Sequence, residues 1–219
     1  MLALASAIAI VLSNVVLTPA GFNDPTADVF AVYTNHRTSV YLWFLLTGIV
    51  MALLLIPVSV ALAYEIRHRA EMLAYVILGF SLLWATARFA TGLLGTTSPD
   101  FVTDLSRISR EDAMDVYNVL TAFDRALNQG DTILGGLWLV LMSFALLRGG
   151  LPRPLCYLGI AVGVAGISPV VPPLAIQGAS VFLLGSTLWF GLAGLAMVRS
   201  APSRRYSPHQ TDSRHIPAE

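Results

Sequence analysis

Lysine is missing from the 219-residue sequence, and cysteine occurs only once. All 13 basic side chains are therefore arginines, and 13 acidic side chains bring the formal net charge to zero. The single cysteine, Cys156, excludes an internal disulfide and any metal site built from cysteine pairs. Charged residues make up 12% of the chain and form no dense basic patch, so we expect no nucleic-acid partner.

The sequence also lacks the short motifs that specify a reaction. It contains no phosphate-binding loop, serine triad or nucleotide-binding fingerprint. Its histidines stand apart from one another and from other ligands at metal-binding spacing, at His36, His68, His209 and His215. The acidic stretch over residues 100–131 lacks the calcium-loop pattern, and we interpret it as a solvated helix face. We therefore expect no metal, no cofactor and no enzymatic activity.

Apolar residues are what the chain has in abundance. They make up 56% of the sequence, give a mean hydropathy of +0.71 and come in long blocks. This pattern predicts an all-α, polytopic integral membrane protein. We expect a transmembrane domain over residues 1–198, with six spans at about residues 2–18, 41–64, 72–95, 132–147, 155–171 and 174–198. Residues 199–219 are polar and rich in proline and serine, which predicts a disordered tail.

The first two spans have features of their own. No positive stretch precedes the first one, so we interpret it as a membrane helix, with a cleaved signal peptide as the alternative. Pro57 removes a backbone donor inside the second span and predicts a kink there.

The fourth span continues a polar helix that we expect over about residues 109–130. Ser109 is a candidate N-cap, and Glu111 and Asp112 fall in the first turn, where the helix dipole favours anions. At 1.5 Å per residue this helix exceeds the ~30 Å hydrocarbon core, so its first half is predicted to lie outside the membrane. Its apolar side chains recur at three- and four-residue steps, which indicates a stripe that rests on the membrane surface or on residues 21–38. Gly130 permits a bend where the helix enters the bilayer.

Arginines set the expected orientation. The tail and the loops after the second and fourth spans are arginine-rich, with Arg67, Arg69, Arg148, Arg153, Arg199, Arg204, Arg205 and Arg214. The opposite loops are mainly acidic. Because cytoplasmic loops carry the excess of arginine, both termini are predicted to be cytoplasmic.

Arg88 is the candidate site residue, because a charged side chain inside a span is costly unless it is paired or hydrated. Counting depth along the spans predicts that it pairs with Asp131, or with Asp124 if the helix dips. Asn14 and Gln177 would complete a polar cluster in the outer leaflet. One interpretation is a pocket for an anionic or polar headgroup; the other is a structural ion pair that orients the helices.

Glycines punctuate the last two spans and predict close packing of helix backbones. They are Gly159, Gly163, Gly166, Gly185, Gly191 and Gly194. Packing within the chain and a face for another subunit are both open.

Two stretches carry a resemblance to a known family. The hairpin LGGLWLVLMSFALLRGGLPRPLCYLGIAVGVAG and the Arg88-bearing segment LAYVILGFSLLWATARFATGLLG resemble the bacterial membrane proteins grouped as domain-of-unknown-function family 4386. The resemblance implies a six-helix protein of the bacterial inner membrane and supplies no activity. From the glycine faces and the absence of reaction motifs we expect a non-enzymatic accessory or structural subunit of a larger membrane assembly, in contact with lipids and other subunits. The alternative is a small transporter or ligand binder built around Arg88.

Overall fold

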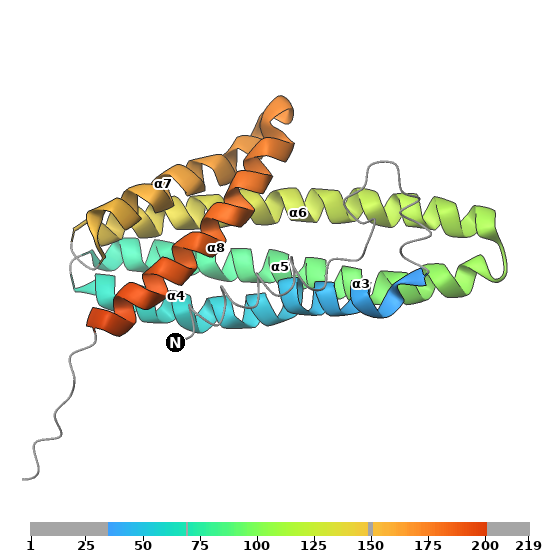
Figure 1. Ribbon diagram of the computed structural model, residues 1–219, viewed down its shortest axis with the longest axis horizontal. Helices are drawn as coiled ribbons and strands as arrows, with labels where there is room; N and C mark the ends of the chain where they lie inside the picture. Colours follow the sequence, from blue (N-terminus) through green and yellow to red (C-terminus); the bar gives the residue numbers. More distant parts are fainter. Residues whose placement is uncertain (1–34, 69, 149–150, 201–219) are drawn as a thin grey trace, which may run out of the picture.

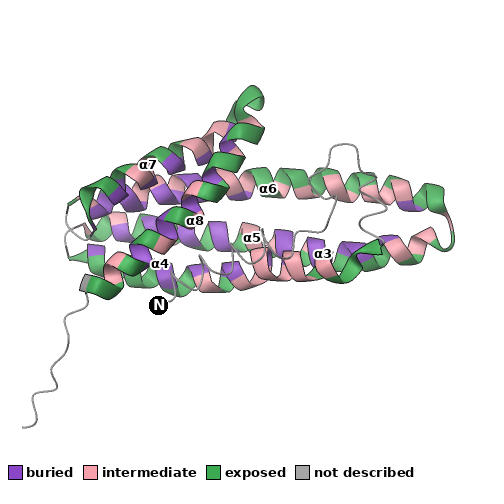
Figure 2. Cartoon of the chain, viewed as in Figure 1, coloured by how far each residue is buried: buried purple, intermediate pink, exposed green. Residues whose placement is uncertain are grey.

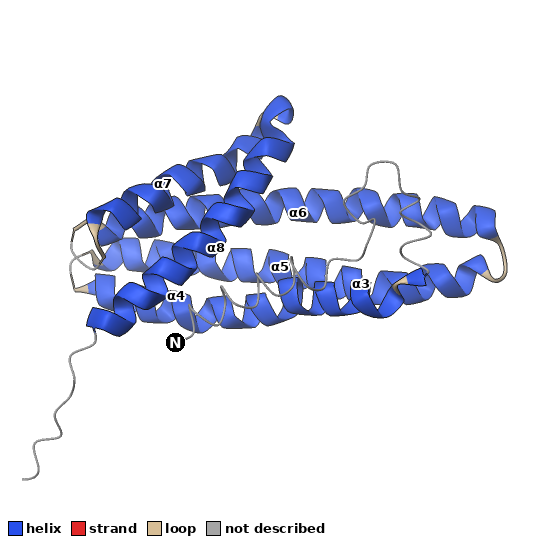
Figure 3. Cartoon of the chain, in the orientation of Figure 1, coloured by secondary structure: helices blue, strands red, loops and turns tan. Residues whose placement is uncertain are grey.

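The computed structural model describes residues 35–68, 70–148 and 151–200, and every regular element in these ranges is helical (Figure 3). The first helical rod is made of α3 (Arg37–Phe44), the π-helical turn η1 (Leu45–Val50) and α4 (Met51–Arg67). The others are α5 (Glu71–Ser106), α6 (Arg110–Leu146), α7 (Arg153–Ile167) and α8 (Ala175–Ser200). The short 3-10 turns η2 (Ser168–Val170) and η3 (Pro172–Leu174) join α7 to α8.

Five of the described helical segments are long and apolar enough to cross a membrane: Arg37–Arg67, Glu71–Ser106, Arg110–Leu146, Arg153–Val170 and Pro172–Arg199. The chain is therefore a helical membrane protein. These five segments correspond to the second to sixth predicted spans. The first predicted span, at residues 2–18, and the predicted disordered tail beyond Ser200 lie outside the described residues, so the count of six stays a prediction.

A long antiparallel hairpin of α5 and α6 forms the axis of the described molecule (Figure 1). The rod of α3, η1 and α4 packs along α5, whereas α7 packs on α6. α8 returns obliquely across the bundle in front of α6 (Figure 1). At one end the turn between α5 and α6 projects well beyond the turn between α7 and α8 (Figure 1).

α5 is longer than the sequence predicted. The third span was expected to stop at residue 95, but the helix continues through Pro99 to Ser106. This continuation gives the apolar stripe of α6 its partner, because Val102 and Ala113 are both fully buried with Leu105, Met114, Tyr117 and Leu120 packed around them. The stripe thus packs against α5, a partner that the sequence analysis did not consider.

α6 is a single continuous helix from Arg110 to Leu146, and Ser109 is its N-cap. The Ser109 hydroxyl accepts the backbone N–H of Asp112 at 3.3 Å. At 1.5 Å per residue the helix is about 55 Å long, which exceeds the ~30 Å of a hydrocarbon core. The side-chain amide of Gln129 donates to the carbonyl of Pro169 at 2.8 Å and so fixes the level at which the α7–α8 turn meets α6.

The second span contains a π-helical turn, and the kink predicted at Pro57 stays a prediction. α4 runs through Pro57 without interruption, whereas η1 lies upstream of it at Leu45–Val50. π-helical turns are rare and occur frequently at functional sites. This turn faces α5 at the level of Arg88, as described below.

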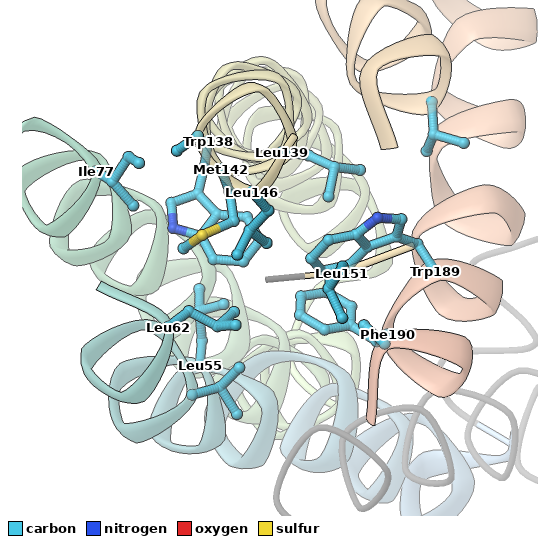
Figure 4. Close-up of a cluster of buried hydrophobic side chains, with 14 of the residues drawn as sticks. Leu55, Leu62, Ile77, Trp138, Leu139, Met142, Leu146, Leu151, Trp189 and Phe190 are labelled. Atoms are coloured by element: carbon cyan, nitrogen blue, oxygen red, sulfur yellow. The ribbon is translucent and has the colours of Figure 1, made fainter. Parts of the chain in front are cut away.

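Aromatic side chains fill the core between α5, α6 and α8 (Figure 4). Trp138 lies 5.4 Å from Trp84 and 5.8 Å from Phe190 between ring centroids. The indole N–H of Trp138 donates to Ser81 Oγ, and that of Trp189 donates to the carbonyl of Leu155 at 3.1 Å. Buried residues lie mainly on the inner faces of the helices, and exposed residues lie mainly on their outer faces (Figure 2). Trp84, Trp138 and Trp189 therefore belong to the buried core.

Glycines let α6 and α7 touch backbone to backbone. A Cβ on Gly163 would lie 2.7 Å from the carbonyl oxygen of Gly136, and one on Gly166 would lie 2.9 Å from the Gly136 Cα. A Cβ on Gly159 would overlap the Ser143 hydroxyl. A Cβ on Gly185 of α8 would lie 2.5 Å from the Val162 side chain of α7. Of the other two glycines of α8, Gly194 is buried and Gly191 is half-buried. The glycines of α7 thus pack within the chain.

Candidate functional site

The guanidinium of Arg88 forms a two-pronged ion pair with the carboxylate of Asp131. Nε donates to Oδ1 at 3.0 Å and Nη2 donates to Oδ2 at 2.5 Å. The Arg88 side chain is 19% exposed and that of Asp131 is 4% exposed. Paired N–H···O bonds of this kind fix geometry as well as charge. The ion pair therefore ties the middle of α5 to the middle of α6.

A third bond connects the ion pair to the first helical rod. Arg88 Nη1 donates to the backbone carbonyl of Thr47 at 2.9 Å, within the π-helical turn. The two helices come close enough for this because Gly48 faces Gly92: a Cβ on Gly48 would overlap the Gly92 Cα. The small residues bring the carbonyl within reach of the arginine, so that one side chain holds three helices.

A cavity of about 270 Å³ lies beside the ion pair. α3, η1, α5, α6 and α8 all contribute to its wall, through Trp43, Phe44, Thr47, Gly48, Arg88, Thr91, Asn128, Asp131, Thr132, Ala179, Ser180, Phe182 and Leu183. Ligand sites commonly combine a largely apolar wall with a few converging polar groups, and this cavity has that composition.

Each hydroxyl of the cavity wall donates its hydrogen bond to a backbone carbonyl of its own helix. Thr47 donates to the carbonyl of Trp43 at 2.7 Å, and Thr91 to that of Ala87 at 3.0 Å. In the same way Thr132 donates to Asn128 at 2.8 Å, and Ser180 to Ile176 at 2.9 Å. A hydroxyl oxygen that has donated its proton still offers lone pairs. The wall therefore presents acceptors to whatever enters.

The other residues proposed for the polar cluster lie elsewhere. Asp124 accepts from the Asn128 side-chain amide at 2.9 Å, whereas the carboxylate that Arg88 contacts is that of Asp131. It lines a second cavity of about 250 Å³, which shares Trp43 and Phe44 with the first. Gln177 is exposed on α8, and Ala179 and Ser180 of that helix line the cavity instead. Asn14 lies outside the described residues.

Sequence reasoning missed the contribution of Thr47 and its neighbours. Thr47 lies at the depth of Arg88, but nothing in the sequence signals that its carbonyl lies in a π-helical turn. The facing pair Gly48 and Gly92 was available as a signal, since each glycine interrupts an apolar span near that depth. Among the described residues, no group of three or more His, Cys, Asp or Glu side chains is arranged to hold a metal ion.

Comparisons with known proteins supply a family but no activity. Neither the curated proteins nor the solved structures include a match to this chain. One family model does match, described as "Domain of unknown function (DUF4386)", and it covers residues 1–199. Since the match spans most of the chain, the protein belongs to this family of unknown function.

Proposed function

We propose that this membrane protein binds an uncharged, hydroxyl-bearing amphiphile in the cavity beside Arg88 and Asp131. The proposal rests on the wall of that cavity. Its hydroxyl groups already donate to backbone carbonyls, so their oxygens can act as acceptors, and the Arg88–Asp131 ion pair beside them has no net charge. A head with several hydroxyl groups can donate to these oxygens. Its apolar part can lie against Phe44, Phe182 and Leu183.

Charge favours an uncharged head over an anionic one. Asp131 already offsets the charge of Arg88, so the site holds no unbalanced positive charge for an anion. A free anion would have to compete with a buried carboxylate that makes two bonds to the guanidinium. The volume of about 270 Å³ is close to the lower end of small-molecule sites, which suits a compact head and the start of a chain.

A titration in phosphatidylcholine nanodiscs tests this proposal through Trp43, which lines the cavity. Monolauroylglycerol should change tryptophan emission saturably, and Trp43→Phe should abolish the change. Methyl laurate lacks hydroxyl groups and laurate is anionic, so both should bind at least tenfold more weakly. Thr132→Val removes one acceptor and should raise the Kd roughly fivefold, as expected for the loss of about 1 kcal/mol.

Equal responses to the three amphiphiles would contradict the proposal, because they would reflect partition into the bilayer. A response that survives in Trp43→Phe would contradict it too, because the signal would then come from another tryptophan. Thr86→Val is the matched control, since Thr86 is an exposed threonine of α5 outside the cavity wall.

A non-enzymatic accessory role in a larger assembly is the second candidate. It is supported by the projecting end of the α5–α6 hairpin, where large apolar side chains are exposed: Phe101, Ile108, Val119 and Phe123. Apolar surface outside a bilayer commonly marks a contact site. Stoichiometric companions that co-purify in mild detergent, and that are lost in Phe101→Ser/Phe123→Ser, would support this role; a bare monomer would count against it.

We also propose a location in the bacterial inner membrane with both termini in the cytoplasm. In this assignment the bilayer ends near Asp131, close to the bond between Gln129 and Pro169. The preceding part of α6 and the last turns of α5 then project outside. The arginines at the other end of the bundle, among them Arg67, Arg148 and Arg153, fit the cytoplasmic side.

A further inference from the structure

A groove of about 330 Å³ lies between the first turns of α7 and the last turns of α8. Aliphatic side chains from both helices form most of its wall: Leu155, Leu158, Leu192, Leu195 and Ala196. Pro152 and Pro154 line it on α7, and Arg199 lines it on α8. The groove is thus apolar except for the arginine in its wall.

Among the described residues that line the groove, the one charged side chain is that of Arg199. Arg199 is exposed in the last turn of α8. Arg153 is exposed and stands in sequence between the two prolines that line the groove, in the first turn of α7. That turn also presents the positive end of the α7 helix dipole. No acidic side chain is among the described residues of the groove wall.

We propose that this groove is a binding site for an anionic phospholipid. One acyl chain lies along the leucines, and the phosphate lies against the guanidinium of Arg199, with Arg153 beside it. Basic pockets between transmembrane helices are typical sites for anionic lipid heads. In a bilayer the apolar wall alone gives little preference, because lipid tails are as apolar as leucine. The arginine end of the groove therefore supplies the selectivity.

This site is separate from the cavity beside Arg88. The cavity takes Ala179, Ser180, Phe182 and Leu183 from the first turns of α8, whereas the groove takes its residues from the last turns. One helix therefore serves two sites near opposite ends. The lipid proposal stands or falls independently of the proposed amphiphile site.

Native mass spectrometry of the full chain from nanodiscs with equal phosphatidylglycerol and phosphatidylcholine tests the proposal. The wild type should retain phosphatidylglycerol in excess over phosphatidylcholine. Arg199→Gln should lower this preference roughly fivefold, and Arg153→Gln/Arg199→Gln should abolish it. Leu195→Trp should reduce retention of the lipid by filling the groove while Arg199 is kept. Arg107→Gln is the matched control, because Arg107 is an exposed arginine at the opposite end of the molecule.

Equal retention of the two lipids by the wild type would overturn the proposal. An equal loss of preference in Arg107→Gln and Arg199→Gln would also overturn it, because the effect would then be one of net charge. Full displacement of phosphatidylglycerol by inorganic phosphate would show that the groove gives the acyl chain no role. Thermal unfolding of each variant shows that it is folded before the lipids are compared.

Discussion

Arg88 carries a charge inside the helical bundle, and groups from two other helical elements offset the free-energy cost of burying it. Asp131 supplies the opposite charge from α6, and Thr47 supplies a carbonyl from the π-helical turn. A buried pair of this kind adds little net stability over apolar residues, whereas breaking it leaves an uncompensated charge. The pair therefore fixes which faces of α5 and α6 meet. Substituting one partner should lower the stability more than substituting both.

Arg88→Leu alone should destabilise the protein by about 3–5 kcal/mol, because the Asp131 side chain is 4% exposed and would be left without its cation. Arg88→Leu/Asp131→Leu should recover most of that loss, since no buried charge remains. Thermal unfolding in one detergent, followed by circular dichroism, measures both. Additive losses in the double variant would show that the two side chains are not coupled.

Helices are the scale at which sequence reasoning succeeded in part. The apolar blocks located the second to sixth spans, and depth counting placed Asp131 slightly above Arg88 and predicted the ion pair that joins them. The end of α5 was missed because residues 96–106 are too polar to be recognised as a continuation of a span. Their helix is stabilised by the contact between Val102 and the apolar stripe of α6. The local sequence does not reveal this contact, because it depends on the tertiary packing of two helices. The π-helical turn has no sequence signature at all.

The α6–α7 contact gives a prediction at this scale. Gly136→Ala should destabilise the bundle, because a Cβ there would lie 2.6 Å from the carbonyl oxygen of Gly163 and 2.8 Å from the carbonyl carbon of Gly166. Neither backbone can move without displacing a helix. Gly79→Ala is the control, since no atom lies within 4 Å of its added Cβ and alanine favours the helix by about 1 kcal/mol. A melting temperature for Gly136→Ala at or above that of Gly79→Ala would contradict this account of the contact.

The two ends of the described molecule differ in charge, and the expected orientation in the membrane depends on this difference. One end carries the projecting α5–α6 turn, with acidic side chains at Asp100, Asp104 and Glu111 (Figure 1). The other end gathers the connections between α4 and α5 and between α6 and α7, where Arg67, Arg148 and Arg153 lie. From the positive-inside rule we expect the acidic end to face outward. Accessibility of the two ends from outside the cell therefore tests the membrane assignment directly.

Cysteine labelling in intact cells provides that test, and the native Cys156 does not interfere because it is fully buried. Ser106→Cys, at the projecting end of α5, should react with an impermeant maleimide from outside. Ser203→Cys, in the arginine-rich tail, should react only after the membrane is permeabilised. The unsubstituted protein should stay unlabelled in both conditions. Reaction of both positions from the same side would mean that an even number of crossings separates them, whereas α6, α7 and α8 predict three. The bilayer boundary near Asp131 would then have to be abandoned.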